Sequence, residues 1–166
     1  MMTTANASTK PAPIKKSLDV RAPRDVAFRV FTAEMTSWWQ LESHHVGEAK
    51  AVAAIVEPRV GGRWYEKGED GSECDWGKVL AWDPPGRVVL AWQLSAAWKF
   101  DPKLHTEVEV RFTDLGGGVT RVELEHRLLE AYGDKSPEMV AAFESPQGWG
   151  RVIAGFAEAA EPAARS

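Results

Sequence analysis

The tryptophans are the residues of this sequence best suited to form a binding surface. A buried tryptophan removes roughly 150–250 Å² from water, which is about 4–6 kcal/mol of gross transfer free energy at ~25 cal/mol per Å². A few rings suffice to anchor a core, so two interpretations stay open: some of the eight rings line a cavity, or together they fill the space between sheet and helix. Because ligand pockets are mostly apolar with few polar groups, the tryptophans suit an apolar or aromatic ligand. The eight tryptophans lie at positions 38, 39, 64, 76, 82, 92, 98 and 149.

His126 is the polar residue most directly associated with this expected site. It lies on the inward side of an alternating stretch, beside Leu124. One interpretation makes it a hydrogen-bonding or acid–base partner of a polar ligand group. The other, which we prefer, makes it a strand-end histidine that is satisfied by backbone or by a carboxylate. No serine or cysteine nucleophile can be assigned to it, so no catalytic residue is predicted.

The remaining polar clusters have simpler interpretations. His44 and His45 are adjacent and lack a second spaced cluster, so we expect a solvated loop there and no metal site. Cys74 is expected to be a half-buried strand thiol, since a reactive thiol needs exposure and a lowered pKa. Arg63 is expected to point away from the cavity rather than to bind a ligand carboxylate. Five carboxylates crowd one hairpin, as expected of a solvated tip: Glu66, Glu69, Asp70, Glu73 and Asp75.

Composition limits the classes of partner. The chain has 166 residues and a net charge of −4, without a basic stripe. Nucleic acid is therefore not expected as a partner, because phosphate binding needs clustered Lys and Arg. No run of about 18 apolar residues is present, so membrane insertion is not expected either. A single cysteine fits a reducing, cytoplasmic location. No cofactor is predicted.

The elements that must position these residues follow from periodicity. Trp149, Val152, Ile153 and Phe156 recur at i, i+3, i+4 and i+7 within 145–160, which predicts a helix with one apolar face. Stretches 105–113 and 119–127 alternate apolar and charged residues, as strands of a sheet wet on one face do. The helix is the one long apolar stripe late in the chain that could cover such a sheet.

The full order predicts an α+β domain: a curved antiparallel sheet, a long C-terminal helix, and two short helices after the first strand. Pro23 suits the start of the first helix, and a second short helix is expected at 36–39. Ser136 is expected to cap a helical turn that ends at Phe143, and Pro146 to break the chain before the last helix. Strands are expected at 14–21, 49–57, 63–67, 73–82, 87–95, 105–113 and 119–127.

An ordered set of short motifs also resembles a known family. The motifs are Gly61-Gly62, Asp70-Gly71, Gly77-Lys78-Val79, Asp83-Pro84-Pro85, Val89-Leu90-Ala91-Trp92, Gly117-Gly118-Val119-Thr120-Arg121-Val122, His126 and Gly148-Trp149. The chain thereby resembles bacterial proteins related to the C-terminal domain of the activator of the heat-shock chaperone ATPase. These belong to the START-like (SRPBCC) helix-grip superfamily.

The resemblance implies a single domain over 14–160, between an N-terminal tail (1–13, expected to be disordered) and a C-terminal tail (161–166). It also implies a cavity between the sheet and the final helix, which would begin at Trp149. It supplies no catalytic motif to carry over. A shared fold does not determine function, which depends on the residues of the site. From alternation, we expect the cavity wall to consist of Trp64, Trp76, Trp92, Val108, Val110, Phe112, Leu124 and His126, with Trp149, Ile153 and Phe156 from the helix.

Three functions remain open at this point. The first is a soluble protein that binds an apolar or aromatic small molecule, with Trp38, Trp39 and Trp98 near the mouth and loop 96–104 as a gate. The second is a cyclase/dehydratase-type enzyme that uses the same cavity, with His126 as acid or base. The third is a chaperone-regulating interaction module, which the lack of a second domain weakens. A homodimer is plausible in each case.

Overall fold

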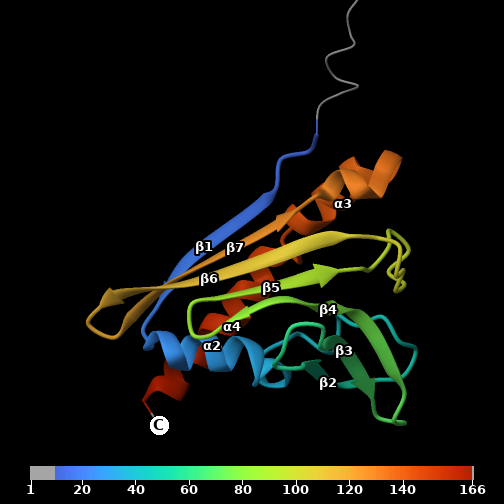
Figure 1. The fold of residues 1–166 in the computed structure, drawn as a ribbon. Coiled ribbons are helices and arrows are strands. Elements are labelled where there is room, and N and C mark those ends of the chain that lie inside the picture. Colours follow the sequence, from blue (N-terminus) through green and yellow to red (C-terminus); the bar gives the residue numbers. More distant parts are fainter. Residues whose placement is uncertain (1–9, 166) are drawn as a thin grey trace, which may run out of the picture.

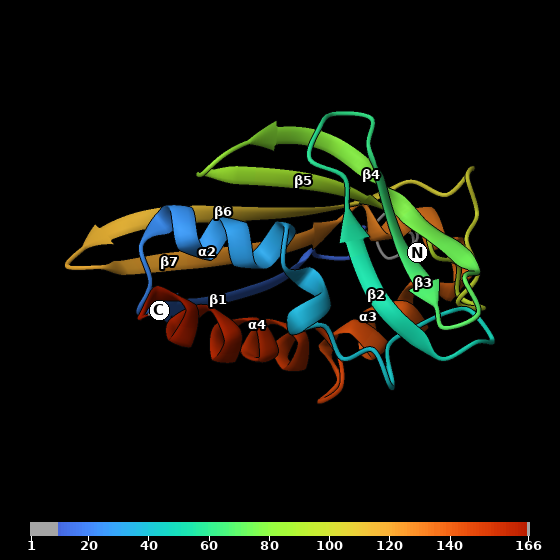
Figure 2. The same cartoon turned by 90° about the horizontal axis from the view of Figure 1, so that it is seen from below.

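A curved sheet with helices on one face forms the domain. The computed structural model describes residues 10–165, so most of the expected N-terminal tail lies outside the described residues. Seven antiparallel strands follow the order β1-β7-β6-β5-β4-β3-β2. Helices α2 and α4 lie on the same side of the sheet (Figures 1 and 2), which confirms the expected helix-grip architecture. Among these residues, no helix is long and apolar enough to cross a membrane.

The strands are β1 (Ile14–Val20), β2 (Ala51–Val56), β3 (Arg63–Gly68), β4 (Glu73–Asp83), β5 (Arg87–Trp92), β6 (Thr106–Gly116) and β7 (Val119–Arg127). The helices are α2 (Arg24–Thr32), η1 (Met35–Ser37), η2 (Leu129–Lys135), α3 (Ser136–Glu144) and α4 (Trp149–Ala164).

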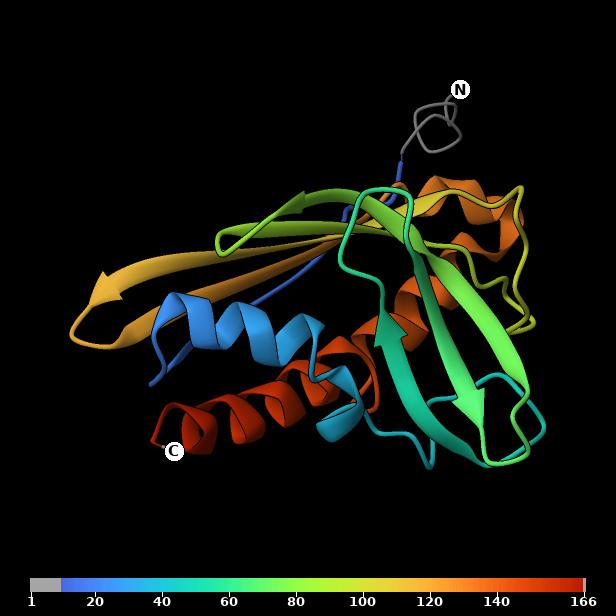
Figure 3. The ribbon, with the colours of Figure 1, turned by 60° about the horizontal axis from the view of Figure 1, so that its bottom comes forward.

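The apolar stripe of α4 faces the sheet as its spacing predicts. Trp149, Val152, Ile153 and Phe156 are all buried, and α4 begins at Trp149. Figure 3 shows α4 and α2 side by side beneath the sheet, with α2 near the C-terminal half of α4. At the other end of α4, strands β2, β3 and β4 curl around the domain. The last helix therefore has different neighbours along its length.

The alternating strands divide into a buried and a charged face. On β6, Val108, Val110 and Phe112 are buried toward the helices. Glu109 points to the outer face, where Arg87, Arg111 and Arg127 donate hydrogen bonds to it. Burial raises the pKa of this carboxyl, but the three guanidinium groups outweigh burial and hold the pKa at about 2. Arginine and glutamate side chains thus pair across neighbouring strands on this face.

Several element ends differ from the prediction. The second short helix is a single 3₁₀ turn, η1, and α4 continues to Ala164, into the expected tail. Strand β5 ends at Trp92, because Leu94 pairs instead with Phe100 in a small hairpin. Ser136 does not cap α3: Lys135 takes that position, and the Ser136 hydroxyl donates to the Leu129 carbonyl.

The chain breaks between α3 and α4, as Pro146 predicts. Gly148 is required at this junction, since an added Cβ would lie 2.0 Å from the carbonyl oxygen of Phe143. The junction therefore turns tightly and places Ser145 and Gln147 beside the first turn of α4.

Candidate functional site

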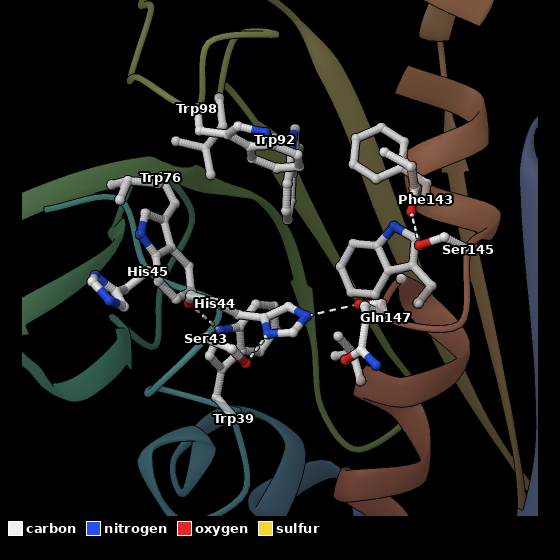
Figure 4. A pocket seen from close by; sticks show the side chains of 16 residues that line it. Trp39, Ser43, His44, His45, Trp76, Trp92, Trp98, Phe143, Ser145 and Gln147 are labelled. Atoms are coloured by element: carbon white, nitrogen blue, oxygen red, sulfur yellow. Dashed lines mark hydrogen bonds between the residues drawn. The ribbon is translucent and has the colours of Figure 1, made fainter. Parts of the chain in front are cut away.

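A cavity of about 500 Å³ lies at the N-terminal end of α4 (Figure 4). Its walls come from β4, β5, α3, α4, the loop after η1 and the loop after β5. Aromatic rings dominate these walls: Trp39, Trp76, Trp92, Trp98, Phe143 and Trp149. The other lining residues are Ser43, His44, His45, Val46, Leu94, Ala142, Ser145, Gln147, Gly148 and Val152.

The aromatic rings of the wall brace one another. Trp92 meets Trp149 at a centroid distance of 5.4 Å and Phe143 at 5.6 Å, both edge to face. Trp39 lies 5.0 Å from Trp76 in a tilted arrangement. Such offset and edge-to-face pairs are the favoured aromatic geometries. The wall is therefore built from mutually supporting rings, as expected of a preformed pocket.

Three of the residues expected at the wall line this cavity: Trp76, Trp92 and Trp149. Trp39 and Trp98, expected near the mouth, line it as well, whereas Trp38 packs against Phe31 and Phe156. The other eight predicted wall residues are buried and do not line the cavity: Trp64, Val108, Val110, Phe112, Leu124, His126, Ile153 and Phe156.

The difference has a simple steric origin. Alternation identifies the inner face of a strand, but not whether space remains in front of each residue. Phe31 of α2 contacts both Phe112 and Phe156 edge to face and fills the space between them. Strand positions near α2 are consequently core, and only those beyond the end of α2 border the cavity.

Sequence reasoning missed the residues that close the cavity from the loop side. Ser43 and Val46 lie in a loop that was expected only to be solvated, and Gln147 lies at the α3–α4 junction. Pro146 indicates that the chain is not helical at this junction, so Gln147 could have been considered as a lining residue. The path of the 40–50 loop had no such signal, because it depends on tertiary contacts.

His126 does not line the cavity; it lies behind the wall and is hydrogen-bonded to the wall residue Trp149. The indole N–H of Trp149 donates to His126 Nδ1 over 3.0 Å, and His126 Nε2 lies 2.9 Å from Thr106 Oγ1. Because an indole can only donate, Nδ1 is the acceptor and Nε2 carries the proton. Thr106 Oγ1 in turn donates to the Trp92 carbonyl over 2.8 Å. This chain of hydrogen bonds fixes two wall tryptophans.

The environment of His126 also decides its charge. The ring is fully buried, and burial lowers its pKa to about 3. His126 is neutral at ordinary pH, and both ring nitrogens are engaged. Neither expected role is found: its partners are an indole and a hydroxyl, not backbone or carboxylate, and it offers no free nitrogen to a ligand.

Glu66 performs a similar task for Trp76. Its carboxylate is 2% exposed and accepts hydrogen bonds from Trp76 Nε1 (2.8 Å) and from the backbone N–H groups of Val46 (2.6 Å) and Gly47 (3.0 Å). Hydrogen bonds to a carboxylate are stronger than neutral ones. Glu66 thus joins a wall tryptophan to the loop at the mouth. The expectation that it belongs to a solvated hairpin tip is wrong.

Arg63 and Cys74 behave as expected. Arg63 bonds to Asp75 and Glu73 and does not line the cavity. Cys74 is half-buried, and burial raises the pKa of its thiol. Within residues 10–165, no group of three or more His, Cys, Asp or Glu side chains is placed to hold a metal ion.

Two histidines lie at the rim. His44 Nε2 donates to the Gln147 carbonyl over 2.7 Å, while its Nδ1 meets Ser43 Oγ at 2.7 Å (Figure 4). We call the His44–Gln147 bond the latch, since it joins the 40–50 loop to the α3–α4 junction. His45 Nδ1 donates to the Gly47 carbonyl over 2.9 Å, which leaves its Nε2 with a free lone pair when the ring is neutral.

Comparison with known proteins places this geometry in context. A synthase of an anthrahydroquino-γ-pyrone, Txn09, solved in complex with a compound designated SUM, is 36% identical and has a TM-score of 0.63. The match covers 90% of this chain and 97% of Txn09. The self-sacrificing resistance protein CalC from Micromonospora echinospora is 28% identical with a TM-score of 0.69, over 91% of this chain and 95% of CalC.

A more distant structure shares the fold alone. A protein from Nitrosomonas europaea is 15% identical with a TM-score of 0.63, over 91% of this chain and 95% of its own. No curated protein matches the sequence significantly. The family described as Activator of Hsp90 ATPase homolog 1-like protein matches residues 21–161. The chain therefore belongs to this family, within the START-like superfamily that its motifs and its gripped helix both indicate.

Proposed function

We propose that this protein binds a planar, mostly apolar aromatic molecule in the tryptophan-lined cavity. The observation that carries the proposal is the cavity itself, about 500 Å³ with five tryptophans in its wall. Ligand pockets commonly measure roughly 300–1,000 Å³ and combine an apolar lining with a few placed polar groups. Here the polar groups gather on the rim, at Ser43, His44, His45 and Gln147.

The buried hydrogen bonds behind the wall support a preformed site. His126 and Glu66 hold Trp149 and Trp76, respectively, without facing the cavity. A preformed wall lowers the ordering cost of binding. Two relatives above 25% identity are an anthrahydroquino-γ-pyrone synthase and a resistance protein, and the synthase was solved with a bound compound. The product named for the synthase suits a cavity that accepts an aromatic molecule.

Two adjacent alanines of α3 provide a matched test. Ala142 lines the cavity and is half-buried, whereas Ala141 is exposed on the same helix and does not line it. Ala142→Trp should fill the cavity, and Ala141→Trp should add the same ring to the surface. The protein would be titrated with 1,8-dihydroxyanthraquinone and 8-anilinonaphthalene-1-sulfonate, with tryptophan fluorescence quenching as the readout.

We expect saturable binding of at least one probe by the wild-type protein and by Ala141→Trp, and at least tenfold weaker binding by Ala142→Trp. Saturable binding of neither probe by the wild type would contradict the proposal, as would equal affinity of the two variants. The intact mass under native conditions, compared with the denatured mass, would then give the size of any molecule that copurifies.

An enzyme of the cyclase/dehydratase type is the second candidate, favoured by the 36% identity to a synthase. His126 cannot serve as its acid or base, because both ring nitrogens are engaged. His45 is the alternative at this rim, since its Nε2 keeps a lone pair. In this case, His45→Ala should abolish turnover of an accepted substrate while leaving its binding intact. Turnover unchanged in His45→Ala would exclude His45 as the base.

A further inference from the structure

Trp98 occupies an unusual place in the backbone. Leu94 and Phe100 pair across a small hairpin, Trp98 N donates to the Ser95 carbonyl, and Ser95 N donates to the Lys99 carbonyl, each over 2.8 Å. This is the pattern of a three-residue loop, in which the third residue usually adopts a left-handed conformation. Trp98 is that residue, with φ 60°. Glycine is the residue that this position ordinarily favours.

The loop does not recover the cost of that conformation through burial of the ring. A bulky residue at positive φ is strained, because its Cβ crowds the neighbouring carbonyl. The Ser95 hydroxyl accepts hydrogen bonds from Ala97 N and Lys99 N and so stabilises the turn itself. Trp98 remains 43% exposed. The chain thus places tryptophan, its largest kind of side chain, at a backbone position that glycine adopts with the least strain, and the ring stays partly exposed to solvent.

The ring of Trp98 lies at the boundary between the cavity and solvent. It lines the cavity and meets Phe143 of α3 edge to face at 6.3 Å. It also borders a neighbouring open groove that contains Arg63, Cys74 and Lys99. In Figure 4, Trp98 lies near Trp92, on the side of the cavity away from Trp39 and the latch. Trp98 is therefore positioned to cover a ligand from the solvent side.

We propose that Trp98 is a ligand-contacting residue that closes the cavity over the bound aromatic molecule, and that its strained backbone serves this contact. The inference rests on the proposed function of the cavity. Strained residues that local geometry does not require are found preferentially at functional sites. A tryptophan face also suits an aromatic ligand through stacking.

Leu128 supplies an internal control. It too has a positive φ (65°) and is 38% exposed, but it is the N-cap residue just before η2 and does not line the cavity. Strain alone therefore does not identify a binding residue. What distinguishes Trp98 is its place over the cavity, and replacing each residue with glycine separates the two effects.

The experiment measures affinity and dissociation rate for whichever of the two probes binds, together with the urea midpoint of unfolding. Trp98→Gly should bind at least tenfold more weakly with faster dissociation, while its urea midpoint stays the same or rises. Trp98→Phe keeps a ring and should stay within about threefold of wild-type affinity. Trp98→Ala should lose the affinity without the gain in midpoint. Leu128→Gly should bind as the wild type does.

Two results would overturn the inference. One is wild-type affinity in Trp98→Gly, which would show that the ring does not contact the ligand. The other is a urea midpoint of Trp98→Gly well below that of the wild type, which would make the ring a structural element. Both differ from a failure of the proposed function, in which the wild-type protein itself would bind neither probe.

Discussion

The two halves of α4 grip the same sheet in different ways. From its middle toward its C-terminus, the part we call the filled half, α4 packs closely, and Phe156 meets Phe31, Trp38 and Phe112 edge to face. Along its N-terminal half, Trp149 and Val152 border a cavity of about 500 Å³. Both halves use aromatic rings. The filled half lies beside α2, whereas the hollow half is closed by loops and by α3.

The buried hydrogen bonds of the two halves differ in their acceptors, since in the filled half the Trp38 indole donates to the backbone carbonyl of Val30. Behind the hollow half, His126, Thr106 and Glu66 bond to wall tryptophans, either to the indole or to the backbone. A ring at a cavity lacks packing partners on one side, so dispersion alone holds it less firmly. Directional hydrogen bonds can supply the missing restraint. The comparison teaches that the indole of the filled half has a backbone acceptor, whereas the tryptophans of the hollow half are also held by the buried side chains of His126, Thr106 and Glu66.

Phe156→Ala tests the filled half and has the largest expected effect. Removing a fully buried phenylalanine from a packed core should lower the free energy of unfolding by about 3–5 kcal/mol. Urea denaturation measures this loss, and Phe156→Leu provides a milder variant of the same sign. Probe affinity of the folded variant should stay unchanged, because Phe156 does not line the cavity. A large drop in affinity at full folding would show that the two halves are not independent.

Thr106→Val tests the hollow half. The substitution keeps the shape but removes the hydroxyl that accepts from His126 and donates to the Trp92 carbonyl. Unpaired buried groups should cost about 1–3 kcal/mol of unfolding free energy. Probe affinity should fall as well, since Trp92 and Trp149 lose their common restraint. The matched control is Thr113→Val on the exposed face of the same strand, expected within about 0.5 kcal/mol of the wild type. Equal stabilities of the two variants would contradict this account.

The sequence predicts which side chains face inward better than it predicts where space remains between them. The spacing of Val152 and Phe156 gives the face of α4, and alternation gives the inner faces of β6 and β7, because both depend on local periodicity. These are the features that the observed fold confirms. The resemblance carried by the short motifs gives the correct superfamily for the same reason: its glycines and tryptophans mark turns and core positions.

The position of the cavity is set by contacts between different elements, which the periodicity of a single element does not reveal. Whether Phe112 lines a cavity or a core is decided by Phe31, which lies on a different element. The rim depends on how the 40–50 loop reaches Gln147, a contact between segments about a hundred residues apart. His126 shows the limit most clearly, since its inward position was predictable but its two partners were not.

The pH dependence of stability sharpens the comparison further. Burial lowers the pKa of His126 to about 3, against about 6.5 in an unfolded chain. Below pH 6.5 the unfolded state therefore binds a proton that the folded state excludes, so stability falls as pH falls toward 3. The free energy of unfolding should therefore be about 1.4 kcal/mol lower at pH 5.5 than at pH 7.5 through His126. His126→Asn, which cannot titrate, should lack this component when urea unfolding is compared at both values. An identical pH dependence in the two proteins would contradict the assignment.

His44→Ala is expected to have the smallest effect on stability and the most local one. It removes the latch to the Gln147 carbonyl and the contact of Nδ1 with Ser43 Oγ, both at the rim, so the free energy of unfolding should fall by only about 0.5–1.5 kcal/mol. The dissociation rate of a bound probe should rise, because the 40–50 loop is no longer tied to the α3–α4 junction. His105→Ala is the control, since its ring pairs with Glu107 on the outer surface. Equal dissociation rates in both variants would show that the loop stays closed without the latch, and that Glu66 and its bonds to Val46 and Gly47 suffice to hold the hollow half shut.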